Sequence, residues 1–217
     1  MNFQIPDFPD LSYGSVYCIG RNYAEHIEEM KSSRTKEPVV FLKPRSSIVH
    51  TGGQVKLPPQ SADVHHEAEL VLLIGAEGKN LSVDNSLDIV KALAIGIDFT
   101  ARDLQSDAKK GGKPWTLSKG FDTFAPVGNF VELKNNLNPG NLNISLQVNG
   151  VEKQNDNTSL MIFTVQEIVS YLSQQFTLTP GDLIFTGTPK GVSPVTTGDH
   201  ITAALQQDLS TLSVDVT

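Results

Sequence analysis

The segment HHEAELVLLIG, residues 65–75, constrains the fold of this chain more than any other. Glu67 and Glu69 stand directly before the apolar run LVLLI. Side chains of a β-strand alternate between two faces, so a strand here would place both glutamates on one face and Ala68 on the other. In a helix, residues two apart point to different sides and would form no common site. Because a continuous apolar run is typical of a strand buried on both faces, we predict a strand over Glu67 to Gly75.

Two carboxylates on one face at the mouth of a buried strand repel each other, and burial then requires a positive partner. A hard divalent cation is one possible partner, and a pair of Lys or Arg side chains is another. The alternative is a solvated strand end with ordinary acidic residues, because the pattern E-x-E is common. The spacing alone leaves these interpretations open.

A third acidic residue, Asp98, ends the apolar segment ALAIGID and precedes FTARDLQ. An Asp between a buried strand and a predicted helix either caps the helix or belongs to a site. Three carboxylates without a thiolate would suit Mg²⁺ or Mn²⁺, with waters completing the coordination. His65 and His66 would suit zinc, but neighbouring residues of a strand point apart, so both cannot join the glutamates.

Short strand-like segments separated by turn signals recur along the chain. Asn149-Gly150, between ISLQV and VEKQ, is a strong hairpin signal. TPGD and TTGD are turns that lead into the strand-like segments LIFTGT and HITAAL. Further strands are predicted over Val16 to Gly20, Val39 to Lys43, Leu93 to Asp98 and Leu212 to Val216.

Helical patterns are fewer. We predict a helix over Tyr23 to Met30 with Asn22 as its cap, and others over Asn85 to Leu93, Thr100 to Lys109 and Val165 to Gln174. Many short strands with a few short helices indicate a mixed, mainly β fold. We expect an N-terminal arm over residues 1–15 and a single catalytic domain over residues 16–217.

Composition excludes several classes of protein. The formal net charge is −7, which argues against a nucleic-acid partner because such partners favour a basic surface. The only cysteine, Cys18, can form no internal disulfide, and we interpret it as a small buried hydrophobe. No segment approaches the ~18 apolar residues of a membrane span, and the N-terminal segment lacks the pattern of a secretory signal. We therefore expect a cytoplasmic protein that binds neither nucleic acid nor membranes.

The segment GRNYAEHIEEM places His26 three residues before Glu29, and such residues are neighbours on a helix. A carboxylate beside an imidazole fixes its tautomer and raises its basicity, which a general base requires. The alternative is a solvated helix face in an acidic stretch. Lys119, in PWTLSKGFDTFAP, carries no special signal alone, because most lysines are solvated.

The order of the motifs is more informative than any single one. The chain contains, in order, GRNYAEH, EPVVFLKP, HHEAELVLLIG, GIDFTARDLQ, GKPWTLSKGFDTFAPVG, MIF and LTPGDLIFTGTPKGV. This series strongly resembles the fumarylacetoacetate hydrolase (FAH) family. It is most similar to the short single-domain members called acylpyruvases or FAH-domain-containing proteins. The resemblance extends over nearly the whole chain, from Val16 to Ala204.

The resemblance implies a mixed β-sandwich roll, usually a homodimer, with one Mg²⁺ or Mn²⁺ per subunit. The positions that match the metal ligands of the family are Glu67, Glu69 and Asp98. His26 and Glu29 match its general-base dyad, in a segment over residues 21–35 that orders over the substrate in relatives. Lys119 matches its active-site lysine. Four further residues match positions that contact substrate or hold the pocket: Arg21, Arg102, Gln105 and Thr188.

Two positions depart from the pattern of the family. Ser193, in GTPKGVSP, stands where many relatives have glycine, and Leu160, in TSLMIF, stands where many have a polar residue. Neither belongs to the predicted metal ligands. We therefore expect both departures to affect the shape of the pocket more than its chemistry.

The resemblance also implies the reaction: a metal-dependent enzyme acting on 2-oxo acids through a pyruvate enolate, which the metal and Lys119 would stabilise. We expect hydrolytic cleavage of the carbon–carbon bond of acylpyruvates or fumarylacetoacetate-like β-diketo acids, with His26 activating the water. The same enolate would arise in an oxaloacetate decarboxylase, a keto–enol tautomerase, or an isomerase or decarboxylase of diacids from aromatic degradation. A non-catalytic binding protein on the same fold is a further alternative, but the joint presence of the matching site residues argues against it.

Overall fold

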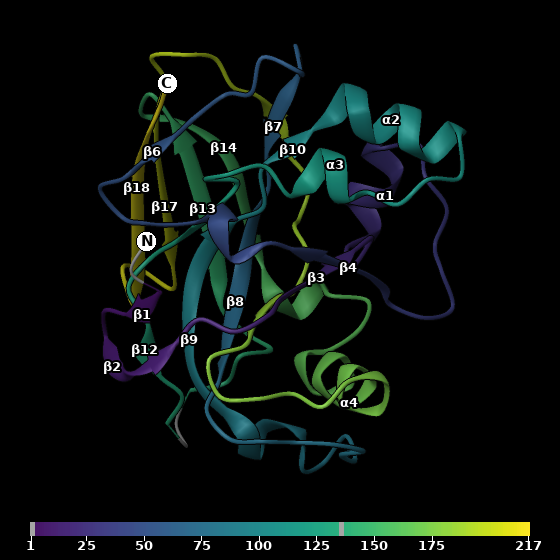
Figure 1. Ribbon diagram of the computed structural model, residues 1–217, viewed down its shortest axis with the longest axis vertical. Helices are drawn as coiled ribbons and strands as arrows, with labels where there is room; N and C mark the ends of the chain where they lie inside the picture. The colour runs from purple at the N-terminus through teal and green to yellow at the C-terminus, as the bar shows by residue number, and fades with distance from the viewer. Residues whose placement is uncertain (1–2, 135–136) are drawn as a thin grey trace.

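The computed structural model describes residues 3–134 and 137–217 of the chain. A mixed sheet of eight strands packs against a sheet of five strands, which lies at the left of Figure 1. The order in the larger sheet is β4 (Val39–Lys43), β3 (Val16–Gly20), β15 (Leu183–Phe185), β8 (Ala68–Ile74), β9 (Val90–Ile97), β11 (Ala125–Val127) and β5 (Ile48–His50), with β12 (Val131–Glu132) paired to β9. The order in the smaller sheet is β14 (Val151–Asn157), β13 (Asn143–Val148), β17 (His200–Leu205), β18 (Ser210–Val216) and β6 (Gln54–Val55).

Two short sheets complete the β structure. One consists of β10 (Thr100–Ala101), β7 (Val64–His66) and β16 (Ser193–Pro194). The other is formed by β1 (Gln4–Ile5) and β2 (Phe8–Ser12), within the segment predicted as an arm. Ile5 of this segment is fully buried against the larger sheet.

Strand β8 lies at the centre of the larger sheet, between β15 and β9, and its side chains alternate between two hydrophobic clusters. Leu70 and Leu72 face the cluster that the two sheets enclose, whereas Val71 and Leu73 face a second cluster. The whole strand is buried, as the apolar run predicts. By alternation Glu69 lies on the same side as Val71, so the sequence pattern brings an acidic residue into the interior of the sheet.

Four α-helices and three 3-10 turns connect the strands. Helices α1 (Ala24–Glu29), α2 (Arg102–Lys110) and α3 (Thr116–Lys119) gather at the upper right of Figure 1, and α4 (Val165–Gln175) lies below them. The 3-10 turns are η1 (Arg45–Ser47), η2 (Ser86–Ile89) and η3 (Thr158–Leu160). None of the helices in the described residues is long and apolar enough to cross a membrane.

The mainly β fold is confirmed, but three local predictions are wrong. Residues 85–93 do not form a helix: η2 ends at Ile89, and β9 begins at Val90 because its backbone pairs with β8. Thr100 and Ala101 form β10 before α2 begins. Asn22 does not cap α1. Its buried side-chain amide donates instead to the carbonyls of Phe163 and Thr186, which anchors the chain just before the helix.

Candidate active site

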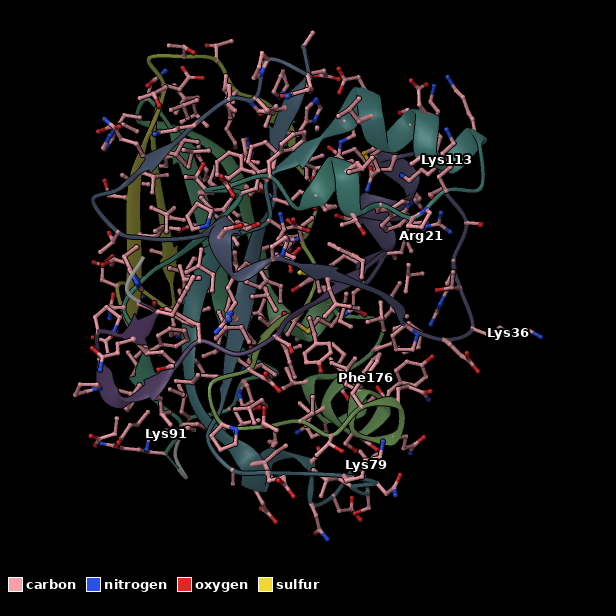
Figure 2. The ribbon with its side chains drawn as sticks, in the orientation of Figure 1. Arg21, Lys36, Lys79, Lys91, Lys113 and Phe176 are labelled. Carbon is pink, nitrogen blue, oxygen red and sulfur yellow. The ribbon has the colours of Figure 1, made fainter. Side chains whose placement is uncertain are left out.

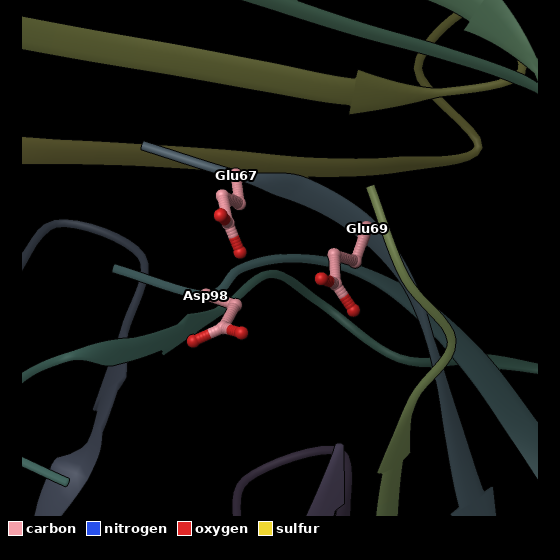
Figure 3. Close-up of side chains that lie close together, drawn as sticks. All are labelled: Glu67, Glu69 and Asp98. Carbon is pink, nitrogen blue, oxygen red and sulfur yellow. The ribbon is translucent and has the colours of Figure 1, made fainter. Parts of the chain in front are cut away.

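Three acidic side chains converge near the start of β8 and the end of β9. Glu67 lies between β7 and β8, Glu69 lies in β8, and Asp98 directly follows β9. The antiparallel register pairs Ala68 with Ile97, and the Asp98 amide donates to the Glu67 carbonyl at 2.8 Å. One oxygen from each carboxylate lies within 4.8 Å of the others, and the three side chains face a common space (Figure 3). All three residues are buried.

Glu67 is compensated by two basic side chains. Lys119 Nζ lies 2.7 Å from one carboxylate oxygen, and an Arg102 guanidinium nitrogen lies 2.5 Å from the other. Burial alone would raise the pKa of Glu67, but the charges of Lys119 and Arg102 outweigh it and hold this pKa well below its ordinary value. Glu67 is therefore ionised in the folded protein. Of the two kinds of partner that the sequence left open for the acidic pair, basic side chains serve Glu67.

Asp98 is compensated by two lysines, and one of them, Lys43, was not predicted as a site residue. Lys119 Nζ lies 2.5 Å from Oδ2, and Lys43 Nζ lies 2.7 Å from Oδ1. Lys43 is fully buried at the end of β4 and also donates to the backbone carbonyls of Phe99, Lys119 and Phe124. Asp98 does not cap α2, because that helix has no side-chain cap. The ammonium of Lys43 thus ties the end of β9 to the end of α3.

Glu69 differs from the other two acids, because no basic side chain in the described residues forms an ion pair with it. Its carboxylate accepts a hydrogen bond from the Gly187 amide at 2.7 Å. Gly187 has φ of 100°, and a Cβ atom there would lie 2.7 Å from Cβ of Asn22, so only glycine fits this approach. Burial, followed by the charges of Asp98 and Glu67, raises the pKa of Glu69 well above its ordinary value. A buried acid in this position calls for a further cation.

The three carboxylates suit a hard divalent cation in their chemistry. They offer oxygen donors only, as Mg²⁺ and Mn²⁺ prefer. His65 and His66 do not join them. His65 Nε2 is 2.9 Å from Asp63, and His66 bridges Gln154 and Ser193. The donor set therefore favours Mg²⁺ or Mn²⁺ over zinc.

The predicted dyad forms on α1. His26 is buried, its Nδ1 lies 3.3 Å from Oε2 of Glu29, and the other oxygen of Glu29 accepts from the Gly191 amide at 3.1 Å. Partial burial raises the pKa of Glu29, but the hydrogen bonds from His26 and from the Gly191 backbone lower it overall. An ionised Glu29 would favour the tautomer of His26 with the proton on Nδ1, which leaves Nε2 as an acceptor.

Of the four residues predicted to contact substrate or hold the pocket, three are buried and the fourth, Arg21, is partly exposed. Arg102 and Gln105 are buried on α2 and bonded to each other at 2.9 Å. Thr188 is buried beside the acids, but its hydroxyl already donates to the Ala68 carbonyl and accepts from Gln154. Its proton is therefore committed within the protein, and Thr188 supports the wall of the pocket. Arg21 lies at the end of β3, closer to solvent.

These residues meet in one pocket of about 440 Å³, its open mouth included. Nine of the ten predicted site residues line it, and Glu29 stands behind His26. Trp115 and Lys109 also line it, although the sequence analysis gave no role to Lys109. Ser193 and Leu160, the two departures from the family pattern, do not line the pocket. Ser193 bonds to His66, and Leu160 is exposed. Cys18 is buried, and burial raises the pKa of its thiol well above the ordinary value, in agreement with a packing role.

The sequence profile described as fumarylacetoacetate (FAA) hydrolase C-terminal matches residues 15–217 of this chain. The chain belongs to the fumarylacetoacetate hydrolase family. Mitochondrial oxaloacetate tautomerase FAHD1 of Bos taurus is 43% identical over 196 residues, which is 90% of this chain and 89% of the relative.

Solved structures of the family share the fold. Fumarylpyruvate hydrolase from Pseudomonas aeruginosa, crystallised in complex with Mn²⁺ and pyruvate, superposes with a TM-score of 0.92 at 38% identity, covering 100% of this chain and 95% of that one. For 2-hydroxyhepta-2,4-diene-1,7-dioate isomerase from Mycobacterium marinum the TM-score is 0.83 at 38% identity, over 96% of this chain and 76% of that one. The family therefore includes hydrolases, isomerases and tautomerases on this same fold.

Proposed function

We propose that this chain is a divalent-metal-dependent enzyme that acts on 2-oxo acids through a pyruvate enolate. The reaction is hydrolytic cleavage of the carbon–carbon bond of acylpyruvates or related β-diketo acids. The observation that carries this proposal is the meeting of three buried carboxylates with the His26–Glu29 pair in one pocket. The Mn²⁺ and pyruvate complex of a structural relative supports it.

Glu67, Glu69 and Asp98 would hold one Mg²⁺ or Mn²⁺ per chain. A bound cation of this kind supplies Lewis acidity, which polarises the carboxylate and 2-oxo oxygens of a chelating substrate. Lys119 contributes a second fixed positive charge beside the same carboxylates. Preorganised positive groups of this kind stabilise the negative charge that develops in the transition state.

His26 activates the water for hydrolysis. Its Nε2 accepts a proton from the water while Glu29 holds Nδ1–H, and the hydroxide adds to the distal carbonyl carbon of the acylpyruvate. The bond between that carbon and the methylene carbon then breaks, and its electron pair becomes the enolate of pyruvate. A proton delivered to the enolate carbon gives pyruvate, and the acyl group leaves as a carboxylic acid.

Residues 21–35 would exclude bulk water during this reaction. Glu29 bonds to the Gly191 amide, and an exposed ion pair joins Glu25 to Lys190, so α1 is fastened to the loop that follows β15. Both contacts are partly solvent-exposed and can break at small cost. The segment is therefore suited to open for substrate entry and to close over the bound substrate.

A second candidate reaction is the tautomerisation of oxaloacetate. It needs the same enolate chemistry but no water, and a relative at 43% identity carries this activity in its name. In that case His26 would transfer a proton to or from carbon rather than from water. Decarboxylation of oxaloacetate and isomerisation of longer diacids pass through the same enolate. The loss of hydrolysis alone in a His26 variant would therefore favour the first candidate.

Three further properties are proposed: assembly as a homodimer, on the family resemblance; a cytoplasmic location, on the composition of the chain; and a catalytic domain that begins at residue 16. Leu42 on edge strand β4 and Leu117 on α3 are exposed and would be available to such an interface. Light scattering after size exclusion tests the dimer. Deletion of residues 1–15 tests whether the remaining domain folds and acts alone.

The proposal is tested by pyruvate formation from acetylpyruvate and from oxaloacetate, with Mg²⁺ and with EDTA, corrected for decarboxylation by the free metal. Faster EDTA-sensitive cleavage of acetylpyruvate supports the hydrolase. EDTA-sensitive turnover of oxaloacetate alone favours decarboxylation, and tautomerisation is followed separately by the loss of enol absorbance. Turnover that persists after rigorous chelation contradicts the proposed metal dependence.

A further inference from the structure

The segment 187–191, which follows β15, contacts two parts of the active site at once. The Gly187 amide donates to Oε2 of Glu69 at 2.7 Å, and the Gly191 amide donates to Oε1 of Glu29 at 3.1 Å. In Figure 3 the yellow-green chain that follows β15 passes beside Glu69. One short segment therefore holds a predicted metal ligand at one end and the partner of His26 at the other.

No ladder of backbone hydrogen bonds holds this segment, because residues 186–192 lie between β15 and β16 without regular secondary structure. Gly187 and Gly191 have φ of 100° and 93°, in the region that favours glycine. A Cβ atom at Gly191 would clash with the Lys153 carbonyl oxygen, so the segment runs directly against β14 there. Its buried polar groups need partners from elsewhere in the chain.

Gln154 of β14 supplies those partners. Its side chain is buried, and its amide nitrogen lies 2.9 Å from Thr188 Oγ1 and 3.1 Å from the Pro189 carbonyl oxygen. The Lys190 carbonyl oxygen is a third acceptor, at 3.4 Å. One side-chain amide thus faces three consecutive residues of the segment 187–191.

The other end of the Gln154 amide fixes its orientation. The Ala68 amide can only donate and the Pro189 carbonyl can only accept, so Oε1 of Gln154 faces the first and Nε2 the second. His66 Nδ1 lies 3.0 Å from the same Oε1 and therefore carries the hydrogen of this bond. The other ring nitrogen of His66 lies 2.8 Å from Ser193 Oγ. Ser193, one of the two departures from the family pattern, thus bonds to the ring that orients Gln154.

Thr188 completes the network. Because its hydroxyl accepts from Gln154, its own proton goes to the Ala68 carbonyl at 2.8 Å. The side-chain polar atoms of His66, Gln154 and Thr188 are therefore all paired. A fully paired buried network is rigid, and the loss of one member leaves others without a partner. Strand β14 and the start of β8 together hold the segment 187–191 in place.

We infer that Gln154 is a positioning residue for the reaction. Its amide fixes the segment 187–191 and, through the Gly187 and Gly191 amides, sets the carboxylates of Glu69 and Glu29. Metal affinity and activation of the water then both depend on a side chain that does not line the pocket. The inference rests on the proposed function for the roles of Glu69 and Glu29.

The first test follows the segment and the metal separately. Gln154→Met keeps the length of the side chain and removes the amide. In the metal-free chain, hydrogen exchange of the Gly187 and Gly191 amides, followed by NMR, should become at least about tenfold faster. Mn²⁺ affinity, measured by calorimetry, should fall by about 10–100-fold, the usual effect of removing a group that orients a metal ligand.

Two further variants frame this result. Asn155→Met is the matched control, because Asn155 is an exposed amide on the same strand and should change neither quantity. Ser193→Ala is the milder variant, because it removes only the bond to His66. It should speed exchange of the same two amides by about threefold, and it tests the network even where Gln154→Met does not fold.

A double-mutant cycle separates positioning from general support of the fold. In the wild-type background, Gln154→Met should lower kcat for acetylpyruvate at saturating Mn²⁺ by at least about tenfold. In Glu29→Ala the link through Gly191 is already broken, so the same change should lower kcat by no more than about twofold. A merely structural role predicts the same loss of kcat in both backgrounds.

The outcomes distinguish this inference from the proposed function. Unchanged exchange in a folded Gln154→Met variant, or in Ser193→Ala where the first does not fold, overturns the inference and leaves the 2-oxo acid site in place. Equal loss of kcat in both backgrounds does the same. If the wild type neither binds Mn²⁺ nor cleaves acetylpyruvate, the proposed function fails and the catalytic part of the inference fails with it, even when exchange responds as expected. A thermal melt of each variant establishes that it is folded.

Discussion

The two ends of the pocket differ in how their charged side chains are paired. At the inner end, Glu67 and Asp98 are buried and each bonds to two basic side chains. At the mouth, Arg21 and Lys109 share an aromatic ring and have no acidic partner in the described residues. One acid at the inner end, Glu69, and two cations at the mouth thus have no ion-pair partner in the described residues.

The difference indicates what each end is built to receive. Glu69 is the acid of the inner end without a basic partner, so this end is completed by a cation. The mouth leaves two cations available to an anionic substrate. Each experiment below changes one end and follows both.

The largest effect is expected from His26→Ala. Loss of a positioned general base lowers a rate by about 10²–10⁴-fold, so acetylpyruvate hydrolysis should fall by this factor while Mn²⁺ affinity stays within about twofold of the wild type. Steady-state kinetics and calorimetry measure the two quantities. Glu28→Ala is the control, because Glu28 is exposed on the same helix. Equal loss of hydrolysis and of Mn²⁺ affinity would show that His26 supports the inner end rather than the water.

Lys43→Met should destabilise the inner end strongly. It leaves Asp98 buried with one cation fewer and removes the donor to three backbone carbonyls. Breaking a buried ion pair by removing one partner costs about 3–5 kcal/mol of the free energy of unfolding. Urea denaturation measures the loss, with Lys36→Met as control because Lys36 is exposed (Figure 2). A loss below about 1 kcal/mol, the range of surface pairs, would show that Lys43 is dispensable.

The mouth should respond to pH through Lys109. The pKa of Lys109 is about 8, lowered by burial and by Arg102 and Arg21, with Glu67 and Lys119 also facing it. A lysine is charged below its pKa, so the charged fraction falls by about tenfold between pH 7 and pH 9. Affinity for an anionic 2-oxo acid such as oxaloacetate should fall between these two pH values, which the pH dependence of its KM measures.

Lys109→Arg sharpens this result. Arginine stays protonated throughout this range, so the pH dependence should disappear. A fall of equal size in the wild type and in Lys109→Arg would assign the titration to another group.

Most residues of the inner end could be predicted from the sequence, whereas Arg21 was the only one of the two cations at the mouth to be predicted. Glu67, Glu69 and Asp98 were candidates because acids beside a buried strand are costly, and the resemblance to the family then assigned them as metal ligands. Lys43 was missed, although it ends the strand-like segment VVFLK, because most lysines are solvated and only the folded structure places this one among three carbonyls. Lys109 was missed for the same reason, despite its helical spacing from Arg102 and Gln105.

Local predictions failed where tertiary pairing decided the structure. The apolar residues of NSLDIVKAL follow a helical period, but Val90 onward pairs with β8 and completes the larger sheet. Asn22 has the composition of a helix cap, but the approach of Phe163 and Thr186 gives its amide other partners. These partners lie more than a hundred residues away in the sequence, so no local pattern could indicate them.

The most direct test of the account is a Mn²⁺ titration of the wild type and of Glu69→Gln, followed by calorimetry. Glutamine keeps the size of the side chain and an acceptor for the Gly187 amide but removes the charge that lacks a basic partner. We predict one Mn²⁺ per wild-type chain and at least about 100-fold weaker binding in Glu69→Gln, a larger effect than the loss of an outer-shell partner. The metal-free variant should unfold at a temperature no lower than the wild type, because an uncompensated buried charge is gone. Wild-type Mn²⁺ affinity in a folded Glu69→Gln variant would contradict the assignment of this pocket as a metal site.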